Sequence, residues 1–278
     1  MQSFSKKSLY SIHADANALG GFLNEPFERI VPTLAPVSLP AVGGFATARS
    51  EAFNLEEVIS CSSAYTRVSG MEHRADGSIS ILVTAVVEGL NLLEVVTAER
   101  VVTQISISIP KGGDLARFSP SGSRFDGLRL AGRPASPKLN TALQWDGGKE
   151  RQGSSLNWLE IHRAGHEQAG KLIESFKARG QKDAVDWAEK RHSWMTKDPV
   201  PKDGGFVLCS LVDGFEGPGA SGACGHIVDI PEFGRIFFGE MRVTRYSIQL
   251  VAIRAELGCP FNGKFGISAG GGGGMGEN

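Results

Sequence analysis

Two stretches of alternating side chains constrain the fold of this chain more than any other feature. In residues 78–88, apolar side chains occupy every second position from Ile79 to Val87, whereas Ser78, Ser80, Thr84 and Glu88 fall on the other face. Residues 101–109 repeat the pattern and end at Pro110. A period of two is that of a β-strand with one buried face. Both stretches therefore predict half-buried strands.

Residues 61–69 are a candidate partner for the strand at 78–88, because the intervening Asp76–Gly77 is typical of a tight hairpin turn. We predict a β-hairpin over 61–88. Residues 88–96 fit either a turn followed by a strand or one short helical turn. Prolines between 24 and 44 rule out a long helix there and favour an extended or edge segment. Further strands are predicted at 8–22, 123–131, 206–212, 235–243, 247–257 and 264–268.

The character of the sequence changes at residues 157–195, which are rich in Ala, Glu, Lys, Arg and Gln. Apolar residues recur there at helical spacing. Gly180 is a stop signal, and Asp183 is a candidate cap for a second helix. Charges of both signs are mixed along the segment, which favours a solvated helix pair on a sheet edge over a nucleic-acid-binding helix.

The predicted fold is mainly β, an antiparallel β-sandwich or open barrel with a helical insertion. Residues 1–140 would form the first part of one β domain, 141–204 the insertion, and 205–268 the second part. The two parts must pair with each other, which requires many long-range contacts. Residues 269–278 are mostly glycine and have few side chains to bury, so we predict a flexible tail.

The composition excludes several classes of protein. The net charge of −1 provides no attraction for nucleic acid, and we expect no such partner. The sequence contains no run of about 18 apolar residues, so we expect no membrane span. The N-terminus lacks an apolar signal core, which predicts a cytoplasmic protein, with signal-independent export as the alternative. Four widely spaced cysteines predict free buried thiols: Cys61, Cys209, Cys224 and Cys259.

Four segments together resemble the β-rich domain of bacterial surface proteins called choice-of-anchor proteins. They are VSLPAVGGFATARS at 37–50, EGLNLLEVVTAERV at 88–101, SGSRFDGLRLAG at 121–132 and IRAELG at 253–258. The resemblance covers about half of the chain and omits the helical insertion. It implies a β-rich fold and an architectural or adhesive role, and it supplies no catalytic residues. Such relatives are typically exported, whereas this chain has no recognisable signal.

His162 and His166 are the strongest candidates for metal ligands. They stand four residues apart, so a helix would place both on one face, and His192 from the second helix is a candidate third ligand. The alternative is a pair of surface or interface histidines on a polar helix, and we favour it. We expect no bound zinc. No phosphate-binding loop or dinucleotide fingerprint is present, so no cofactor is predicted.

Three other features carry weaker signals. Ser221 lies among the glycines of the loop 217–222, but the G-x-S-x-G pattern of a hydrolase is absent, so these glycines are expected to form a turn. Glu240 and Glu256 lie in predicted strands and could point into a barrel mouth. Core packing is favoured over a glycan surface for a group of aromatic residues: Phe233, Phe237, Phe238 and Tyr246. No catalytic residue is identified.

These observations favour a structural or interaction protein that self-associates through its sheet edges rather than through its glycine tail. We therefore expect a homo-oligomer and lean against an enzyme. One alternative is a β-barrel that binds a small molecule or a glycan. Another is a metal-dependent enzyme that uses the histidines of the insertion.

Overall fold

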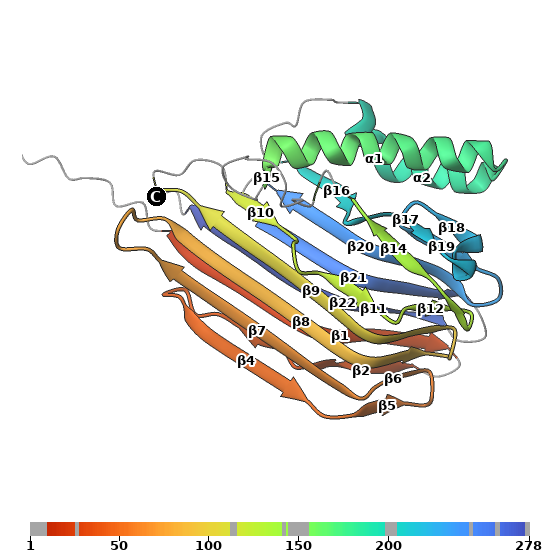
Figure 1. Ribbon diagram of the computed structural model, residues 1–278, viewed down its shortest axis with the longest axis horizontal. Helices are drawn as coiled ribbons and strands as arrows, with labels where there is room; N and C mark the ends of the chain where they lie inside the picture. Colours follow the sequence, from red (N-terminus) through yellow and green to blue (C-terminus); the bar gives the residue numbers. More distant parts are fainter. Residues whose placement is uncertain are drawn as a thin grey trace, which may run out of the picture.

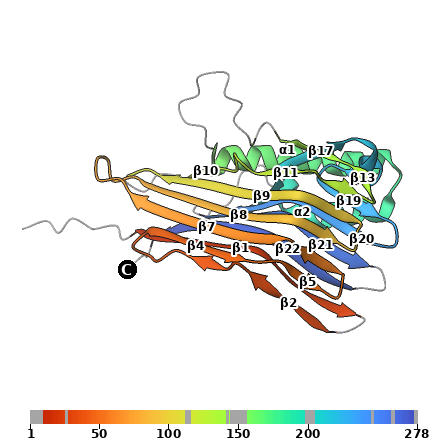
Figure 2. The ribbon, with the colours of Figure 1, turned by 60° about the horizontal axis from the view of Figure 1, so that its bottom comes forward.

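The computed structural model describes residues 10–25, 28–111, 116–140, 143, 156–197, 205–244, 247–258 and 262–275. Within these residues, the chain forms two large antiparallel β-sheets packed face to face, with a pair of helices beside them (Figures 1 and 2). This is the mainly β sandwich with a helical insertion that the alternating pattern predicts. No helix in this part of the chain is long and apolar enough to cross a membrane.

Sheet A joins strands from both ends of the sequence, shown red and blue in Figure 1. Its order is β18-β19-β20-β21-β22-β1-β2, with β16 also paired to β20 and β3 to β1. The strands are β1 (Tyr10–Glu25), β2 (Arg29–Leu34), β3 (Val37–Ser38), β16 (Phe206–Ser210), β18 (Ala223–Cys224), β19 (Ile227–Ile230), β20 (Gly234–Thr244), β21 (Ser247–Gly258) and β22 (Asn262–Met275).

Sheet B is built from the sequence between these two groups. Its longest strands, β7, β8 and β9, are neighbours, and β4 pairs with β7 at one edge. The strands are β4 (Gly44–Ser50), β5 (Phe53–Leu55), β6 (Ile59–Cys61), β7 (Ser63–Glu72), β8 (Ile79–Leu92), β9 (Val96–Ile109), β10 (Arg117–Ser119), β11 (Arg124–Asp126), β12 (Arg129–Leu130), β13 (Arg133–Pro134) and β15 (Leu156–Asn157).

The helices are α1 (Trp158–Ala178) and α2 (Lys182–Lys197), with a short 3-10 helix, η1 (Pro218–Gly222). Asn157 and Glu160 form a capping box that starts α1, and Gly180 has a φ of 67° after its end. From β15, α1 crosses β16, and its second half packs with α2 on β19 and β20. A separate two-stranded sheet pairs β14 (Ser136–Leu139) with β17 (Val212–Glu216).

The predicted alternation is confirmed in β8 and β9. Ile79, Ile81 and Val83 are buried between the sheets, as are Ile105 and Ile107 from β9. The hairpin over 61–88 is confirmed as β7 and β8. Residues 88–96 adopt the turn alternative: β8 continues to 92, the turn follows, and β9 begins at 96.

The free-thiol prediction is confirmed for the described cysteines. Cys61, Cys209 and Cys224 are free and buried, whereas Cys259 lies outside the described residues. Burial raises the pKa of the Cys209 thiol to about 12. At neutral pH this sulfur is therefore a packed apolar atom rather than a nucleophile.

The prediction of a flexible tail from residue 269 is wrong as far as Met275. Residues 269–275 belong to β22, which lies between β1 and β21 and pairs with both. A glycine-rich segment can form a central strand because pairing uses the backbone, and the adjacent strands supply the side chains that fill the core. Residues 276–278 lie outside the described residues, as do both ends of the insertion predicted at 141–204.

A line of irregularities crosses sheet A. The pairing register shifts between Asn17 and Gly20 in β1 and between Val251 and Arg254 in β21, and Gly239 in β20 has a φ of 63°. Each irregularity lets a strand exchange its inward and outward faces. This exchange decides which side chains of β20 face the helices.

Candidate functional site

The helix pair covers an outer patch of sheet A that carries charge, although β20 is mostly apolar. Phe237 packs with the helices, whereas Phe238 lies in the core between the sheets. In a regular strand, residues three apart point to opposite faces. Because the strand is irregular at Gly239, Glu240 instead shares the outer face with Phe237 and contacts α2.

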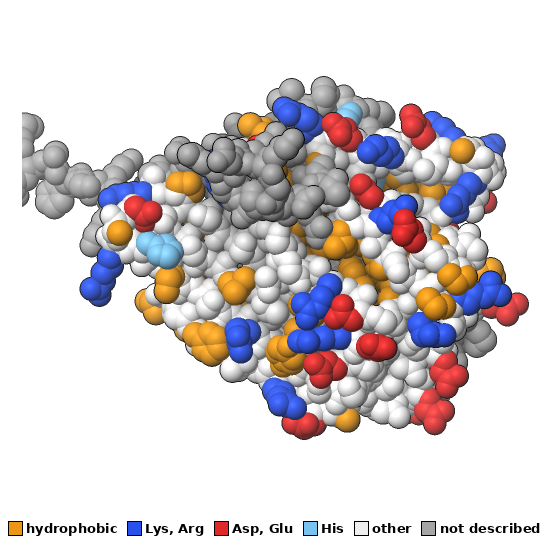
Figure 3. Space-filling model, in the orientation of Figure 1, with side chains coloured by type: hydrophobic (Ala, Val, Ile, Leu, Met, Phe, Trp, Pro, Cys, Tyr) orange, Lys and Arg blue, Asp and Glu red, His pale blue; other side chains and the backbone are white. Residues whose placement is uncertain are grey.

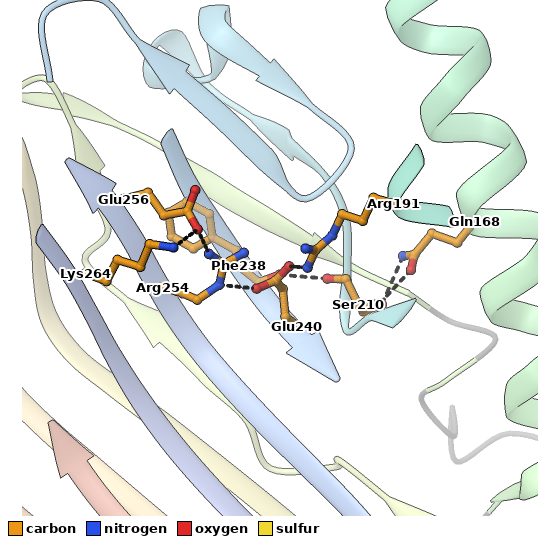
Figure 4. Close-up of polar contacts among 8 residues, drawn as sticks. All are labelled: Gln168, Arg191, Ser210, Phe238, Glu240, Arg254, Glu256 and Lys264. Carbon is orange, nitrogen blue, oxygen red and sulfur yellow. Dashed lines mark hydrogen bonds and ion pairs between the residues drawn. The ribbon is translucent and has the colours of Figure 1, made fainter. Parts of the chain in front are cut away.

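The carboxylate of Glu240 lies between two guanidinium groups (Figure 4). Nη2 of Arg191 on α2 donates to Oε1 at 2.7 Å, and Nε of Arg254 on β21 donates to Oε2 at 2.6 Å. The Glu240 side chain is only 12% exposed. Burial opposes its ionisation, but the hydrogen bond and charge of Arg254 outweigh burial and hold the pKa of Glu240 below its usual value. Glu240 is therefore an ionised, buried carboxylate.

The ionic cluster continues across the outer face of sheet A. Arg254 also donates from Nη1 to Glu256, and Nζ of Lys264 on β22 lies 3.4 Å from the same carboxylate. Figure 4 shows Arg254 between Glu240 and Glu256. The expectation that the two acids point into a barrel mouth is therefore wrong: they line the outer face of a sandwich sheet and share one arginine.

Aromatic rings hold the guanidinium groups in place. Cζ of Arg254 lies 3.7 Å from the centroid of the Phe237 ring. Cζ of Arg191 lies 5.6 Å from the ring centroids of both Phe237 and Trp187. Cations are attracted to the faces of such rings. The cluster is thus supported by stacking as well as by ion pairs.

Gln168 attaches α1 to the strands below the cluster. Its amide oxygen accepts from the backbone N–H of Ser210 at 2.6 Å, and Nε2 donates to the Ser210 carbonyl at 2.9 Å. The Ser210 hydroxyl donates in turn to the carbonyl of Phe238 at 2.7 Å (Figure 4). This buried chain of hydrogen bonds fixes the spacing between α1, β16 and β20.

A pocket of about 120 Å³ opens beside the cluster, between the two helices and strands β16, β20 and β21. Its apolar lining includes Leu172, Leu208 and Val251. Its polar side chains come from α1, α2, β20, β21 and the turn before β19. They are Gln168, Arg191, His192, His226, Glu240, Arg242, Gln249 and Arg254.

Two of these side chains are buried histidines. Burial lowers the pKa of His226 to about 4, and it does the same for His192. Glu240 partly opposes both shifts, whereas the neighbouring arginine charges add to them. Both imidazoles are therefore neutral at pH 7. Nδ1 of His226 has no hydrogen-bond partner among the described residues.

The three histidines considered as metal ligands are divided between two surroundings. His162 is buried on α1, where burial and the nearby His166 lower its pKa, so it is not a surface histidine. Nδ1 of His166 lies 3.2 Å from the Met195 carbonyl, which accepts from it. His192 lines the pocket. Within the described ranges, no three His, Cys, Asp or Glu side chains are placed to hold a metal ion.

The other sequence candidates have structural roles. Ser221 lies in η1, and Gly217 before it has a φ of 98°, so glycine serves a turn there as expected. Phe233, Phe237 and Phe238 are all buried, which confirms core packing. Tyr246 lies outside the described residues.

Sequence reasoning missed His226, Arg242 and Arg254. The sequence does carry a signal for Arg254. Residues two apart on a strand share a face, and Glu256, which has the opposite charge, follows Arg254 at that spacing, so the two can form an ion pair. No local pattern marks His226. It precedes β19 and reaches the pocket only through the pairing of β19 with β20.

A second surface feature is the edge of sheet B at β4. This strand pairs with β7 on one side, and no partner strand lies on its other side within the described residues. Its outward-facing side chains include Phe45, which is 60% exposed, and Arg49, which is 69% exposed. The edge is therefore one strand of seven residues, with alternate backbone groups directed away from the sheet.

A broad hollow of about 970 Å³ adjoins this edge on the outer face of sheet B. Its floor is rich in serine from β7, β8 and β9, and exposed Val42, Phe45, Met71 and Leu82 surround it. Figure 3 views this face: at the left, separate hydrophobic side chains stand among uncharged ones, whereas charged side chains gather at the centre and right. The helices lie against sheet A, so they do not cover this hollow.

A comparison with known protein families identifies the family of this chain. A family model described as a domain of unknown function, DUF8256, matches residues 10–244, from the first residue of β1 to the last residue of β20. The chain belongs to the DUF8256 family. In this DUF8256 member, the helix pair and β20 lie within the match, whereas β21 and β22 lie beyond it. No curated protein and no solved structure matches the chain.

Proposed function

We propose that this protein is an interaction protein that self-associates, and that two copies join through the edge strand β4. The observation that carries the proposal is the open edge. In an edge strand, alternate backbone N–H and C=O groups point away from the sheet and can pair with another strand. Strand β4, Gly44–Ser50, is seven residues long, and every second residue along it offers such groups.

The other sheet edges are less suited to pairing. Pro32 interrupts the edge strand β2, and Pro134 ends the two-residue strand β13. Strands β15 and β18 have only two residues each, β5 has three, and β16 is covered by α1. Proline lacks the backbone donor, and short or covered strands offer few free groups. By contrast, β4 contains no proline and one charged residue, Arg49.

The sequence of β4 is complementary to itself in one antiparallel register. If Thr47 lies opposite Thr47 of a second copy, Phe45 lies opposite Arg49 twice, once on each side of the two-fold axis. Both side chains are exposed on the outer face. A guanidinium over a Phe ring contributes about 0.5–1 kcal/mol at such a site. A two-fold interface of this kind closes at two copies.

The hollow beside β4 would add apolar contact area. Met71 is 58% exposed and Val42 is 92% exposed at its margin. Exposed apolar side chains gathered around one concave surface are typical of interaction sites. A second copy paired along β4 would bring its own outer face next to this hollow.

The test introduces charged residues at the two positions that the predicted register places opposite each other, Phe45 and Arg49. The mass of the protein in solution is measured by light scattering over a range of concentrations. Phe45→Lys would place a lysine side chain opposite Arg49 twice, so we expect the dimer to weaken by at least about tenfold, which corresponds to ~1.4 kcal/mol. Adding Arg49→Glu would restore an attractive pair and should recover the dimer.

Ile30→Lys is the matched control, because Ile30 is 81% exposed but lies on β2. This variant should dimerise like the unmodified chain. A mass of one chain at every concentration for the unmodified protein would overturn the proposal. So would a Phe45→Lys variant that dimerises normally.

A further inference from the structure

We propose that the pocket between the helix pair and strands β20 and β21 binds a small organic carboxylate. This inference is independent of self-association, because the pocket lies on the outer face of sheet A and β4 lies at the edge of sheet B. Three properties of the pocket support it: its charge, its unpaired buried nitrogen atoms and its mixed lining.

The charge of the lining favours an anion. Arg191, Arg242 and Arg254 contribute guanidinium groups, and Glu240 is the lining acid. The lining histidines are neutral at pH 7, since burial lowers the pKa of each. The side chains around this partly enclosed space therefore carry a net positive charge. Arginine side chains recognise carboxylates through paired charge-assisted hydrogen bonds.

Two buried nitrogen atoms lack partners at this place. Nδ1 of His226 and Nη2 of Arg254 are both inaccessible and have no hydrogen-bond partner among the described residues. His226 is itself only 5% exposed, and both residues line the pocket. An unpaired buried donor costs about 1–3 kcal/mol. Nη2 of Arg254 is a donor, and Nδ1 of His226 is a donor in the tautomer that carries its proton there, so a carboxylate can accept from both once the two side chains turn toward the pocket.

The apolar part of the lining indicates an organic ligand. Leu172, Leu208 and Val251 face the same space as the arginines. A cavity of about 150 Å³ can hold a molecule the size of benzene. The volume here, about 120 Å³, suits a carboxylate with a short alkyl chain. Propionate is therefore the probe.

The experiment is a calorimetric titration of the full chain with sodium propionate, at constant ionic strength. Sodium phosphate and 1-propanol are titrated in parallel. We expect one propionate per chain. Phosphate lacks the alkyl group and 1-propanol lacks the charge, so each should bind at least about tenfold more weakly, a difference of ~1.4 kcal/mol.

Arg242→Gln is the informative variant. Arg242 lines the pocket but is exposed, and it stacks on Phe206 at 4.4 Å rather than joining the Glu240 ion pairs, so its loss should leave the fold intact. Propionate affinity should fall by about tenfold or more. Arg124→Gln is the matched control: it makes the same change at a half-exposed arginine of β11 in sheet B, outside the pocket lining and the ionic cluster, and should bind propionate normally.

Several outcomes would overturn the proposal. One is the absence of saturable propionate binding. Another is 1-propanol or phosphate binding as tightly as propionate. The third is equal loss of affinity in both variants, since that would indicate a general charge effect. Phe45→Lys should bind propionate like the unmodified chain, so failure of the dimer and failure of the ligand site are distinguishable.

Discussion

At the scale of single residues, the chain buries more charge than its composition suggests. Glu240 lies between Arg191 and Arg254 beneath a helix pair. A buried ion pair gains little net stability over a well-packed apolar pair, because desolvation offsets most of the attraction. Removing one partner is costly, however, since a charge is then left uncompensated. The cluster therefore contributes more to the specific placement of α2 on β20 and β21 than to overall stability.

The buried histidines make stability depend on pH. The pKa of His226 is about 4 in the folded protein, while an unfolded histidine titrates near 6.5. Between these values the unfolded chain binds a proton that the folded chain does not. Stability therefore falls as the pH falls through this window, by up to about 3 kcal/mol for this residue. His192 contributes in the same direction.

Urea unfolding at a series of pH values between 7.5 and 4.5 measures this dependence. His226→Asn keeps a polar side chain but removes this titration, so it should lower the slope and leave the part that His192, His162 and Glu240 contribute. His13→Asn, at an exposed position, controls for the loss of one histidine from the unfolded chain. Stability that stays constant or rises on acidification would contradict the burial of neutral imidazoles.

At the scale of secondary-structure elements, β22 shows why glycine can be required inside a sheet. A Cβ built on Gly271 would lie 2.9 Å from Cδ1 of Ile107 and 3.4 Å from Cγ2 of Val83, both in sheet B. A Cβ on the preceding Gly270 would meet its nearest heavy atoms at 3.8 Å, an ordinary contact distance. Two consecutive glycines on one strand thus face very different amounts of space.

This difference gives a matched pair of substitutions. Gly271→Val forces extra volume between the sheets and should lower the free energy of unfolding by about 1–3 kcal/mol. Gly270→Val points away from that core and should change stability by less than about 1 kcal/mol. Thermal and urea unfolding of both variants provide the measurement. Equal effects would contradict the placement of β22 between the sheets.

At the scale of the whole molecule, sheet A depends on its last strand. The pairing of β22 with β1 and with β21 joins the first strand of the chain to the strands that follow the helices. Truncation after Ser268 would remove the pairs made by residues 269–275. Each backbone hydrogen bond contributes about 1 kcal/mol net, and their sum is comparable with a typical total stability of ~5–15 kcal/mol.

We therefore expect the chain truncated after Ser268 to lose cooperative unfolding, measured by circular dichroism during heating. A chain truncated after Met275 keeps all of β22 and is the control. A cooperative transition in the shorter chain at an unchanged temperature would show that residues 269–275 are dispensable. That self-association does not depend on the glycine segment stays a prediction, but the segment is a strand rather than a flexible tail as far as Met275.

The sequence by itself determined the elements whose side chains carry a pattern. Alternation identified β8 and β9, Asp76–Gly77 identified the hairpin turn, and helical spacing with Gly180 identified the helix pair. These signals are local, because each arises from the period with which successive side chains of one segment meet a buried surface. The general fold class followed from them.

Only the tertiary structure decided the position of β22 and the composition of the pocket. Glycines 270–274 carry no side chains, so no period can be read from them, and their pairing depends on β1, more than 200 residues away. The pocket combines His192 from a helix with His226, Glu240 and Arg254 from separate parts of sheet A. Their proximity arises from long-range strand pairing and from the reversal of faces at Gly239, neither of which leaves a local trace in the sequence.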